Sequence, residues 1–127
     1  MTPKMVDVCV VGAGRAGMVH ARNFRWNLPG ARLVGIVETD PGHTADALAE
    51  LGMDAEVAFV SLEEALARVD PDAVVVTSPT FTHADLVVAA ARAGKHVLCE
   101  KPLARTLDEC DRIESAVGEA GVVFEMG

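Results

Sequence analysis

Residues 10–17 read Val10-Val11-Gly12-Ala13-Gly14-Arg15-Ala16-Gly17 and join an apolar run to a helix-period segment. Glycine-rich turns are common, but a G-x-G-x-x-G sequence between a strand and a helix is typical of a phosphate-binding turn. We expect Gly12 to permit a sharp turn, Gly14 to let a pyrophosphate approach the backbone, and Gly17 to let the helix pack closely. The helix start at Arg15 and Ala16 would offer free amides and a positive dipole end to the anion.

Apolar runs rich in β-branched residues alternate with helix-period segments along the whole chain. The expected strands are Met5–Val11, Arg32–Val37, Ala73–Thr77, His96–Cys99 and Val122–Met126, with a weaker sixth at Glu56–Val60. Such alternation predicts βαβ units and a parallel sheet with helices on both faces. The chain of 127 residues therefore predicts one α/β domain over 1–127, a doubly wound parallel sheet or Rossmann fold of about six strands.

The predicted helices have recognisable boundaries. The first carries an apolar stripe and ends at Pro29-Gly30; the stripe consists of Gly17, Ala21, Phe24 and Leu28. Two later helices begin with S/T-x-x-E capping boxes, in which a hydroxyl and a carboxylate satisfy amides of the first turn. These boxes are Ser61 with Glu64, and Thr106 with Glu109.

Composition excludes several classes of function. The 19 acidic and 11 basic residues give a net charge of −8, which would repel a nucleic-acid backbone. No apolar run approaches the roughly 20 residues that cross a bilayer, and the first residues do not form an export signal. The three cysteines form no C-x-x-C pair, so neither a disulfide framework nor a metal site is expected. We therefore expect a cytoplasmic protein with no nucleic-acid or membrane partner.

Glu38 lies where the second strand should end, 21 positions after Gly17. A carboxylate at this place accepts hydrogen bonds from the adenosine ribose hydroxyls of a dinucleotide. It would repel a 2′-phosphate, and the following Thr39 and Asp40 supply no cation, so NAD is favoured over NADP. Two alternatives remain open: Glu38 faces solvent, or the turn holds no ligand or another one, such as S-adenosylmethionine.

The second half of the chain carries a more discriminating pattern. It reads Thr77-Ser78-Pro79-Thr80-x-x-His83, and later Ala93-Gly94-Lys95-His96-Val97-Leu98-Cys99-Glu100-Lys101-Pro102-Leu103-Ala104. With the glycine turn, this resembles the N-terminal domain of the glucose–fructose oxidoreductase, inositol dehydrogenase and rhizopine-catabolism (Gfo/Idh/MocA) family. The resemblance spans essentially all 127 residues.

The resemblance implies roles for individual residues. Thr77, Ser78 and Pro79 would line the nicotinamide side of the cofactor, and His83 matches a histidine just after them. Glu100 would lie near the nicotinamide ribose. The family usually has Asn where this chain has Thr80. The predicted cofactor-binding set is Gly12, Gly14, Arg15, Ala16, Gly17, Glu38, Thr39, Thr77, Ser78, Pro79, Thr80, His83, Glu100 and Lys101.

Lys101 is the predicted catalytic residue. In the resemblance it reaches toward the substrate, where an ammonium would stabilise negative charge on oxygen during hydride transfer. Without the surrounding motif it would be taken for an ordinary exposed lysine. We assign no chemistry to His20 and His43, which are expected to pack, cap or face solvent. His96 is expected to make a structural hydrogen bond, Cys110 to be buried, and Cys99 to have no nucleophilic role.

Family members continue into a second α/β domain that has no counterpart in these 127 residues. That domain carries other catalytic groups, shapes the sugar or polyol pocket and often forms the oligomer interface, so a homo-oligomer is one option. One hypothesis is that the chain is the cofactor domain of an NAD-dependent oxidoreductase that acts on a CH–OH or carbonyl group of a sugar, cyclitol or similar molecule. Alone it would bind cofactor with little turnover. The alternative is a freestanding nucleotide-binding or sensing module without catalysis.

Overall fold

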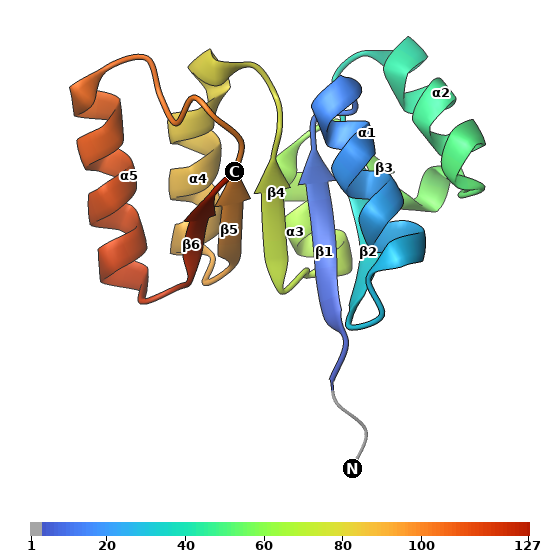
Figure 1. Cartoon of the computed structure of the whole chain (residues 1–127), viewed down its shortest axis with the longest axis horizontal. Coiled ribbons are helices and arrows are strands. Elements are labelled where there is room, and N and C mark those ends of the chain that lie inside the picture. Colours follow the sequence, from blue (N-terminus) through green and yellow to red (C-terminus); the bar gives the residue numbers. More distant parts are fainter. Residues whose placement is uncertain (1–3) are drawn as a thin grey trace.

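The computed structural model describes residues 4–127 and contains one parallel sheet with the strand order β3-β2-β1-β4-β5-β6 (Figure 1). The strands are β1 (Val6–Val11), β2 (Ala31–Val37), β3 (Ala58–Phe59), β4 (Ala73–Val76), β5 (His96–Cys99) and β6 (Phe124–Met126). The chain builds β1, β2 and β3 outward, then returns to place β4 on the other side of β1. The predicted doubly wound sheet is confirmed, and its order reverses between β1 and β4, where open α/β sheets bind ligands.

Helices lie on both faces of the sheet, as the βαβ pattern predicts, but on the face of α1 they leave β4, β5 and β6 uncovered (Figure 1). They are α1 (Arg15–Arg22), α2 (Pro41–Leu51), α3 (Leu62–Val69), α4 (His83–Arg92) and α5 (Leu107–Ala120). One buried cluster joins Ala21 of α1 and Leu51 of α2 to one face. The other joins Leu62 of α3, Val87 of α4 and Ile113 of α5 to the opposite face.

The weakest predicted strand is the shortest observed one. β3 has two residues, because a 3₁₀ turn at Ala55–Val57 precedes it and Ser61 caps α3 soon after it. The strand still pairs with β2, with Ile36 opposite Ala58 and Val37 opposite Phe59. Its place at the sheet edge therefore rests on two residue pairs.

The first helix differs from its prediction at its end. After α1 the chain makes a π-helical turn at Asn23–Asn27, in which the amide of Leu28 donates to the carbonyl of Asn23. This wider turn breaks the spacing of the apolar stripe. Phe24 is half-buried, whereas Leu28 is 45% exposed and does not join the core.

The hydroxyls of both predicted capping boxes bind as expected. Ser61 accepts from the amide of Glu64 at 3.2 Å, and Thr106 accepts from the amide of Glu109 at 3.1 Å. The carboxylate of Glu109 makes a different contact from the predicted one. It accepts from the amide of Arg105 at 2.9 Å and from the guanidinium of the same residue at 2.8 Å.

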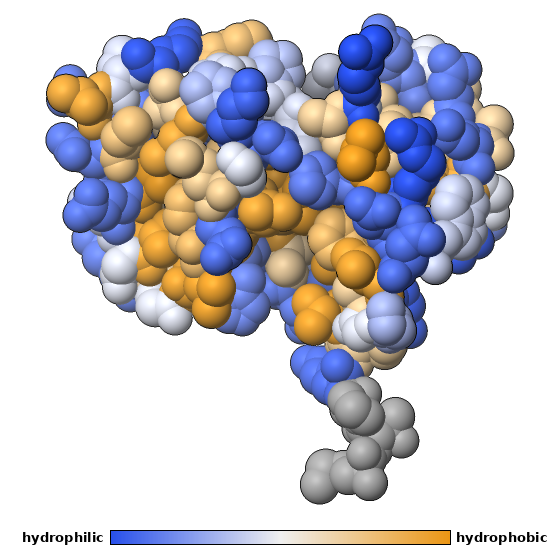
Figure 2. Space-filling model, viewed as in Figure 1, coloured by the Kyte–Doolittle hydropathy of each residue, from blue (hydrophilic) through white to orange (hydrophobic). Residues whose placement is uncertain are grey.

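One face of the sheet is open beside α1. Figure 2 shows hydrophobic side chains at the surface over β4, β5 and β6. A shallow groove of about 370 Å³ lies there, lined in part by Phe24, Val75, Leu98 and Val123. Nearby, the Nδ1 atom of His96 accepts from the amide of Val123 at 3.0 Å, the structural bond predicted for this histidine. Within residues 4–127, every helix is too short or too polar to cross a bilayer.

Candidate dinucleotide site

The glycine turn leads from β1 into α1, and its glycines meet different demands. Gly12 has a φ of +99°, and a Cβ there would lie 2.7 Å from the amide nitrogen of Ser78. A Cβ on Gly17 would lie 1.7 Å from the carbonyl oxygen of Gly12. Both positions therefore need glycine for the fold itself. The amide of Gly12 also donates to the carbonyl of Val37 at 2.8 Å, which ties the turn to β2.

Gly14 differs from its two neighbours in the motif. Its φ of −79° and ψ of −165° are open to any residue, and no heavy atom lies within 4 Å of a Cβ built there. Gly14, Arg15 and Ala16 are exposed at the N-terminus of α1, where the first amides of a helix have no partner within the helix. Nothing in the fold requires glycine at position 14, so the missing side chain leaves space for something outside the chain.

A cleft of about 640 Å³ opens beside this turn at the carboxyl edge of the sheet. It brings together most of the predicted cofactor residues: Gly12, Gly14, Ala16, Glu38, Thr39, Thr77, Ser78, Pro79, Thr80, His83, Glu100 and Lys101. Two predicted residues do not line it. Arg15 is exposed at the helix start, and Gly17 is buried beneath the turn. Asp40 and His43 line the cleft without having been predicted to do so.

Glu38 connects β2 to the glycine turn. Its Oε1 accepts from the amide of Ala13 at 2.8 Å, and its Oε2 accepts from the amide of Asp40 at 2.9 Å. The side chain is only 12% exposed, with the ring of His43 3.8 Å away. The alternative of a solvent-facing glutamate therefore does not describe this side chain.

Asp40 begins α2. Its carboxylate accepts from the amides of Gly42 and His43, and these two hydrogen bonds, that of His43 foremost, lower the pKa of Asp40.

Thr77 holds the turn in place from β4. Its hydroxyl lies 2.7 Å from the carbonyl of Val11 and 2.9 Å from that of Gly12. The following residue, Ser78, shares a hydrogen bond of 2.7 Å with the hydroxyl of Thr82. The segment after β4 is thus fixed both to the glycine turn and to the start of α4.

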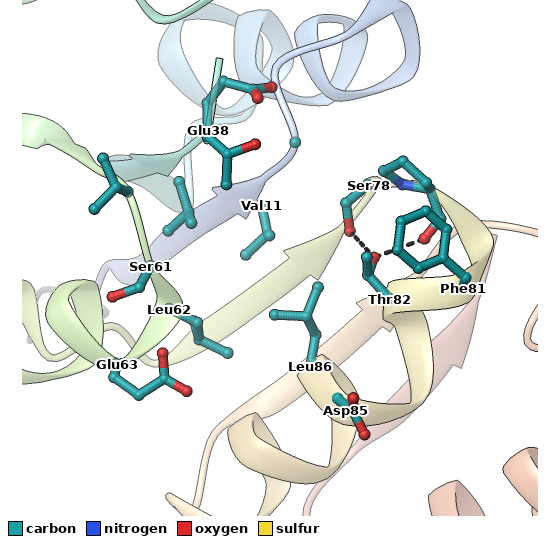
Figure 3. A pocket seen from close by; sticks show the side chains of 15 residues that line it. Val11, Glu38, Ser61, Leu62, Glu63, Ser78, Phe81, Thr82, Asp85 and Leu86 are labelled. Carbon is teal, nitrogen blue, oxygen red and sulfur yellow. Dashed lines mark hydrogen bonds between the residues drawn. The ribbon is translucent and has the colours of Figure 1, made fainter. Parts of the chain in front are cut away.

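A second hollow of about 460 Å³ adjoins the cleft and is largely apolar (Figure 3). Gly12, Glu38, Thr39, Ser78 and Pro79 line both spaces. Figure 3 shows Val11, Leu62, Phe81 and Leu86 around the hollow, with Glu38 at one side. These apolar residues come from four separate segments: Val11 from β1, Leu62 from α3, Phe81 from a 3₁₀ turn and Leu86 from α4. No local motif marked them, so the sequence did not reveal this part of the site.

Glu100 follows β5, and its carboxylate is held by a residue of α1. Its Oε1 lies 2.9 Å from Nε2 of His20, and its Oε2 accepts from the amide of Lys101 at 3.2 Å. The hydrogen bond from His20 is the main reason that the pKa of Glu100 is lowered, with the Lys101 amide adding to it. The sequence predicted only a packing, capping or solvent-facing role for His20, whereas in the structure it also holds the carboxylate of Glu100. Its place three residues after Gly17 puts it on the same face of the helix, but that spacing alone does not identify Glu100 as its partner.

Lys101 and His83 occupy opposite environments in the cleft. Lys101 is exposed at the rim. His83 is 1% exposed, and its two ring nitrogens lie 2.8 Å from the carbonyl of Ser78 and 3.2 Å from that of Leu103.

The three cysteines are free, with Cys9 and Cys99 buried and Cys110 only half-buried. Within the described residues 4–127, no three side chains of the metal-binding types cluster together.

Residues 6–127 match the Gfo/Idh/MocA family, described as an oxidoreductase family with an NAD-binding Rossmann fold. The chain is 36% identical over 126 residues to scyllo-inositol 2-dehydrogenase (NAD(+)) of Bacillus subtilis, covering 96% of this chain and 35% of the relative. It is 40% identical over 111 residues to inositol 2-dehydrogenase of Burkholderia cenocepacia, covering 87% of this chain and 33% of the relative. The chain thus spans about a third of the length of these curated relatives.

Solved structures agree with these matches. Scyllo-inositol dehydrogenase from Lactobacillus casei, with bound cofactor NAD(H) and scyllo-inositol, superposes with a TM-score of 0.89 at 28% identity. The superposition covers 98% of this chain and 36% of that one. The similarity therefore extends over nearly the whole described fold.

Proposed function

Because this chain belongs to the Gfo/Idh/MocA family of oxidoreductases, we propose that its cleft binds NAD for hydride transfer to or from a CH–OH or carbonyl carbon. The substrate we propose for the longer protein is a cyclitol, sugar or similar polyol, because the named relatives are inositol dehydrogenases. One observation carries the cofactor assignment. Gly14 lacks a side chain at a place where the fold would accept one, beside the exposed amides of a helix start.

The residues present suit the parts of the dinucleotide. The pyrophosphate would lie against Gly14 and Ala16, and the adenosine ribose against Glu38, which has carboxylate oxygens to accept hydroxyl hydrogen bonds. The apolar hollow next to Glu38 suits the adenine ring. A 2′-phosphate would meet Glu38 and Asp40 together, which supports NAD over NADP.

The far end of the cleft would receive the nicotinamide, which accepts or donates the hydride when bound. Thr77, Ser78 and Thr80 would line this end, with Glu100 placed by His20. Lys101 stands at the rim, where its ammonium would stabilise negative charge on a substrate oxygen.

The longer protein would contain more than the cofactor cleft. Further catalytic groups and the substrate pocket would come from a second domain, and a homo-oligomer would form through that domain. Three free cysteines support a cytoplasmic setting for such a protein. The 127-residue chain alone should bind NADH and turn over polyols negligibly, because positioning and general-base contributions worth several powers of ten are missing.

Titration of the 127-residue chain with NADH, followed by nicotinamide fluorescence, tests the proposal. We compare wild type with Gly14→Ala and with Gly30→Ala, a matched change at another glycine that has nothing within 4 Å. Both variants should fold as wild type does, and only Gly14→Ala should weaken NADH binding, by about tenfold or more, corresponding to ~1.4 kcal/mol. Absence of binding by folded wild type, or equal affinities for both variants, would refute the proposal.

A further inference from the structure

His83 lies between the two segments that would surround the nicotinamide. It is the first residue of α4 and is almost completely buried. Its Nε2 lies 2.8 Å from the carbonyl oxygen of Ser78, in the segment after β4. Its Nδ1 lies 3.2 Å from the carbonyl oxygen of Leu103, in the segment after β5. One ring therefore touches both segments from beneath the cleft.

The hydrogen-bond requirements of these contacts select one form of the ring. A neutral imidazole has one N–H donor and one lone-pair acceptor, whereas both carbonyls can only accept. With the proton on Nδ1, two lone pairs would face each other across the 2.8 Å between Nε2 and Ser78. With protons on both nitrogens, a charge would be buried without a carboxylate, since the described histidine ion pairs are those of His20 and His43. The form that remains carries its proton on Nε2, which donates to Ser78; Nδ1 is then an acceptor, so its longer contact of 3.2 Å with the carbonyl of Leu103 is not a hydrogen bond.

That form needs a donor for Nδ1, and Cys99 supplies one. The Sγ atom of Cys99 lies 3.4 Å from Nδ1 of His83, within hydrogen-bond range for sulfur and closer than the other acceptor of its proton, the carbonyl oxygen of Glu100 at 3.6 Å. Cys99 is the last residue of β5 and is fully buried. Burial, with the nearby charge of Glu100, raises the pKa of the Cys99 thiol to about 11, so at neutral pH it keeps the proton that it donates.

We propose that His83 is a positioning residue, held as the neutral Nε2–H tautomer by the thiol of Cys99, and that its ring fixes the segment after β4 relative to the end of β5. In this role the ring does not contact the cofactor through its nitrogens. It acts on the cleft through its two partners: Ser78 itself lines the cleft, and Cys99 is followed by Glu100, which also lines it. The link to cofactor binding rests on the proposed function, whereas the tautomer and its thiol donor stand apart from it.

The tautomer is tested by long-range ¹H–¹⁵N correlation NMR of the labelled chain at pH 7. The signals of His83 are assigned by their loss in His83→Gln. We expect one protonated nitrogen, Nε2, and one unprotonated nitrogen, Nδ1, whose resonance shifts when Cys99→Ala removes the thiol. Cys110→Ala, which removes the thiol on α5, should leave that resonance unchanged. An imidazolium, the Nδ1–H tautomer, or an Nδ1 resonance unaffected by Cys99→Ala would each overturn the arrangement.

The positioning role is tested by NADH affinity. His83→Leu removes the hydrogen bond to Ser78, whereas Val87→Ala removes buried volume from the same helix without reaching the cleft. Among folded samples, His83→Leu should weaken NADH binding about three- to tenfold, the size of one net hydrogen bond. Val87→Ala should leave the affinity within about twofold of wild type, and His83→Gln, which can still donate to Ser78, should recover part of the loss. Equal affinities for His83→Leu and Val87→Ala would overturn the role.

Failure of the proposed function has a different signature. If folded wild type binds no NADH, the proposed function fails and the positioning role for the cofactor fails with it. The NMR result would still decide whether His83 and Cys99 are arranged as stated. A normal wild-type affinity that all His83 variants share would instead overturn the positioning role alone.

Discussion

Nε2 of His20 lies 2.9 Å from Oε1 of Glu100, although 80 residues separate the two in sequence. A side chain of the phosphate-binding helix thus holds the carboxylate that follows β5. The two halves of the sheet, which carry the two halves of the cleft, are joined by this contact across the point where the strand order reverses.

Replacing His20 should change the titration of Glu100. The hydrogen bond from His20 is the largest cause of the lowered pKa of Glu100, so His20→Ala should raise that pKa toward its ordinary value. Carbon-detected NMR titration of the glutamate carboxyl groups measures it directly. His43→Ala, which removes an imidazole beside Glu38 instead, serves as the control. An unchanged pKa of Glu100 in His20→Ala would show that the contact is not made in solution.

Reversing the charge of Glu38 should shift the preference between cofactors. Glu38→Arg removes the repulsion of a 2′-phosphate, and we expect the ratio of NADPH to NADH affinity to rise about tenfold, or ~1.4 kcal/mol. Affinity for both should also fall somewhat, because the amides of Ala13 and Asp40 lose their acceptor. Glu63→Arg makes the same charge change in the adjoining hollow and should affect NADH and NADPH alike. Competition titrations measure the ratio, and an unchanged ratio in Glu38→Arg would remove Glu38 from the ribose site.

Alanine at Gly17 should destabilise the fold strongly. The added Cβ would lie 1.7 Å from the carbonyl of Gly12 and 2.7 Å from the hydroxyl of Thr77, so the start of α1 must move. We expect a loss of about 1–3 kcal/mol or more in the free energy of unfolding. Gly118→Ala on α5, where a Cβ meets nothing within 4 Å, should instead gain about 0.5–1 kcal/mol. Urea unfolding compares the two; similar effects would contradict the close packing at Gly17.

The pair of Glu109 and Arg105 should contribute to stability in a defined pH window. The Arg105 guanidinium, followed by the Arg105 amide, lowers the pKa of Glu109 from 4.5 to about 2. A carboxyl whose pKa is lower in the folded state adds stability above its unfolded pKa and loses it as pH falls through the folded one. The unfolding free energy of Glu109→Gln should therefore depend less on pH between 4.5 and 2 than that of wild type. Arg105→Gln should flatten the same window, and a wild-type slope in both variants would disprove the contribution.

Local patterns predicted most of the fold because they reflect local physics. The β-branched runs and the glycine turn predicted the strands, the start of α1 and a doubly wound parallel sheet, since a parallel βαβ unit has few arrangements. The end of α1 was not predictable, because the π-helical turn at Asn23–Asn27 leaves the spacing of apolar residues unchanged in the sequence. The length of β3 depended on turns on both sides of it.

The candidate site was predictable where a residue lies in a motif. Glu38 and Glu100 were found by distance from Gly17 and by the Glu-Lys-Pro sequence. The contact of His20 with Glu100 and the burial of His83 were not, because both depend on segments brought together only by the folded sheet. The apolar hollow escaped detection for the same reason, since its residues come from separate segments of the chain.

Gly14 allows selection for a ligand to be distinguished from selection for the fold. Its backbone angles suit any amino acid and its missing side chain touches nothing, so folding alone gives evolution no reason to retain it. In a descendant that no longer needed its cofactor, mutation should replace Gly14 freely while Gly12 and Gly17 persist. A residue other than glycine at position 14 would then mark lineages that lost cofactor binding while the fold itself was still unchanged.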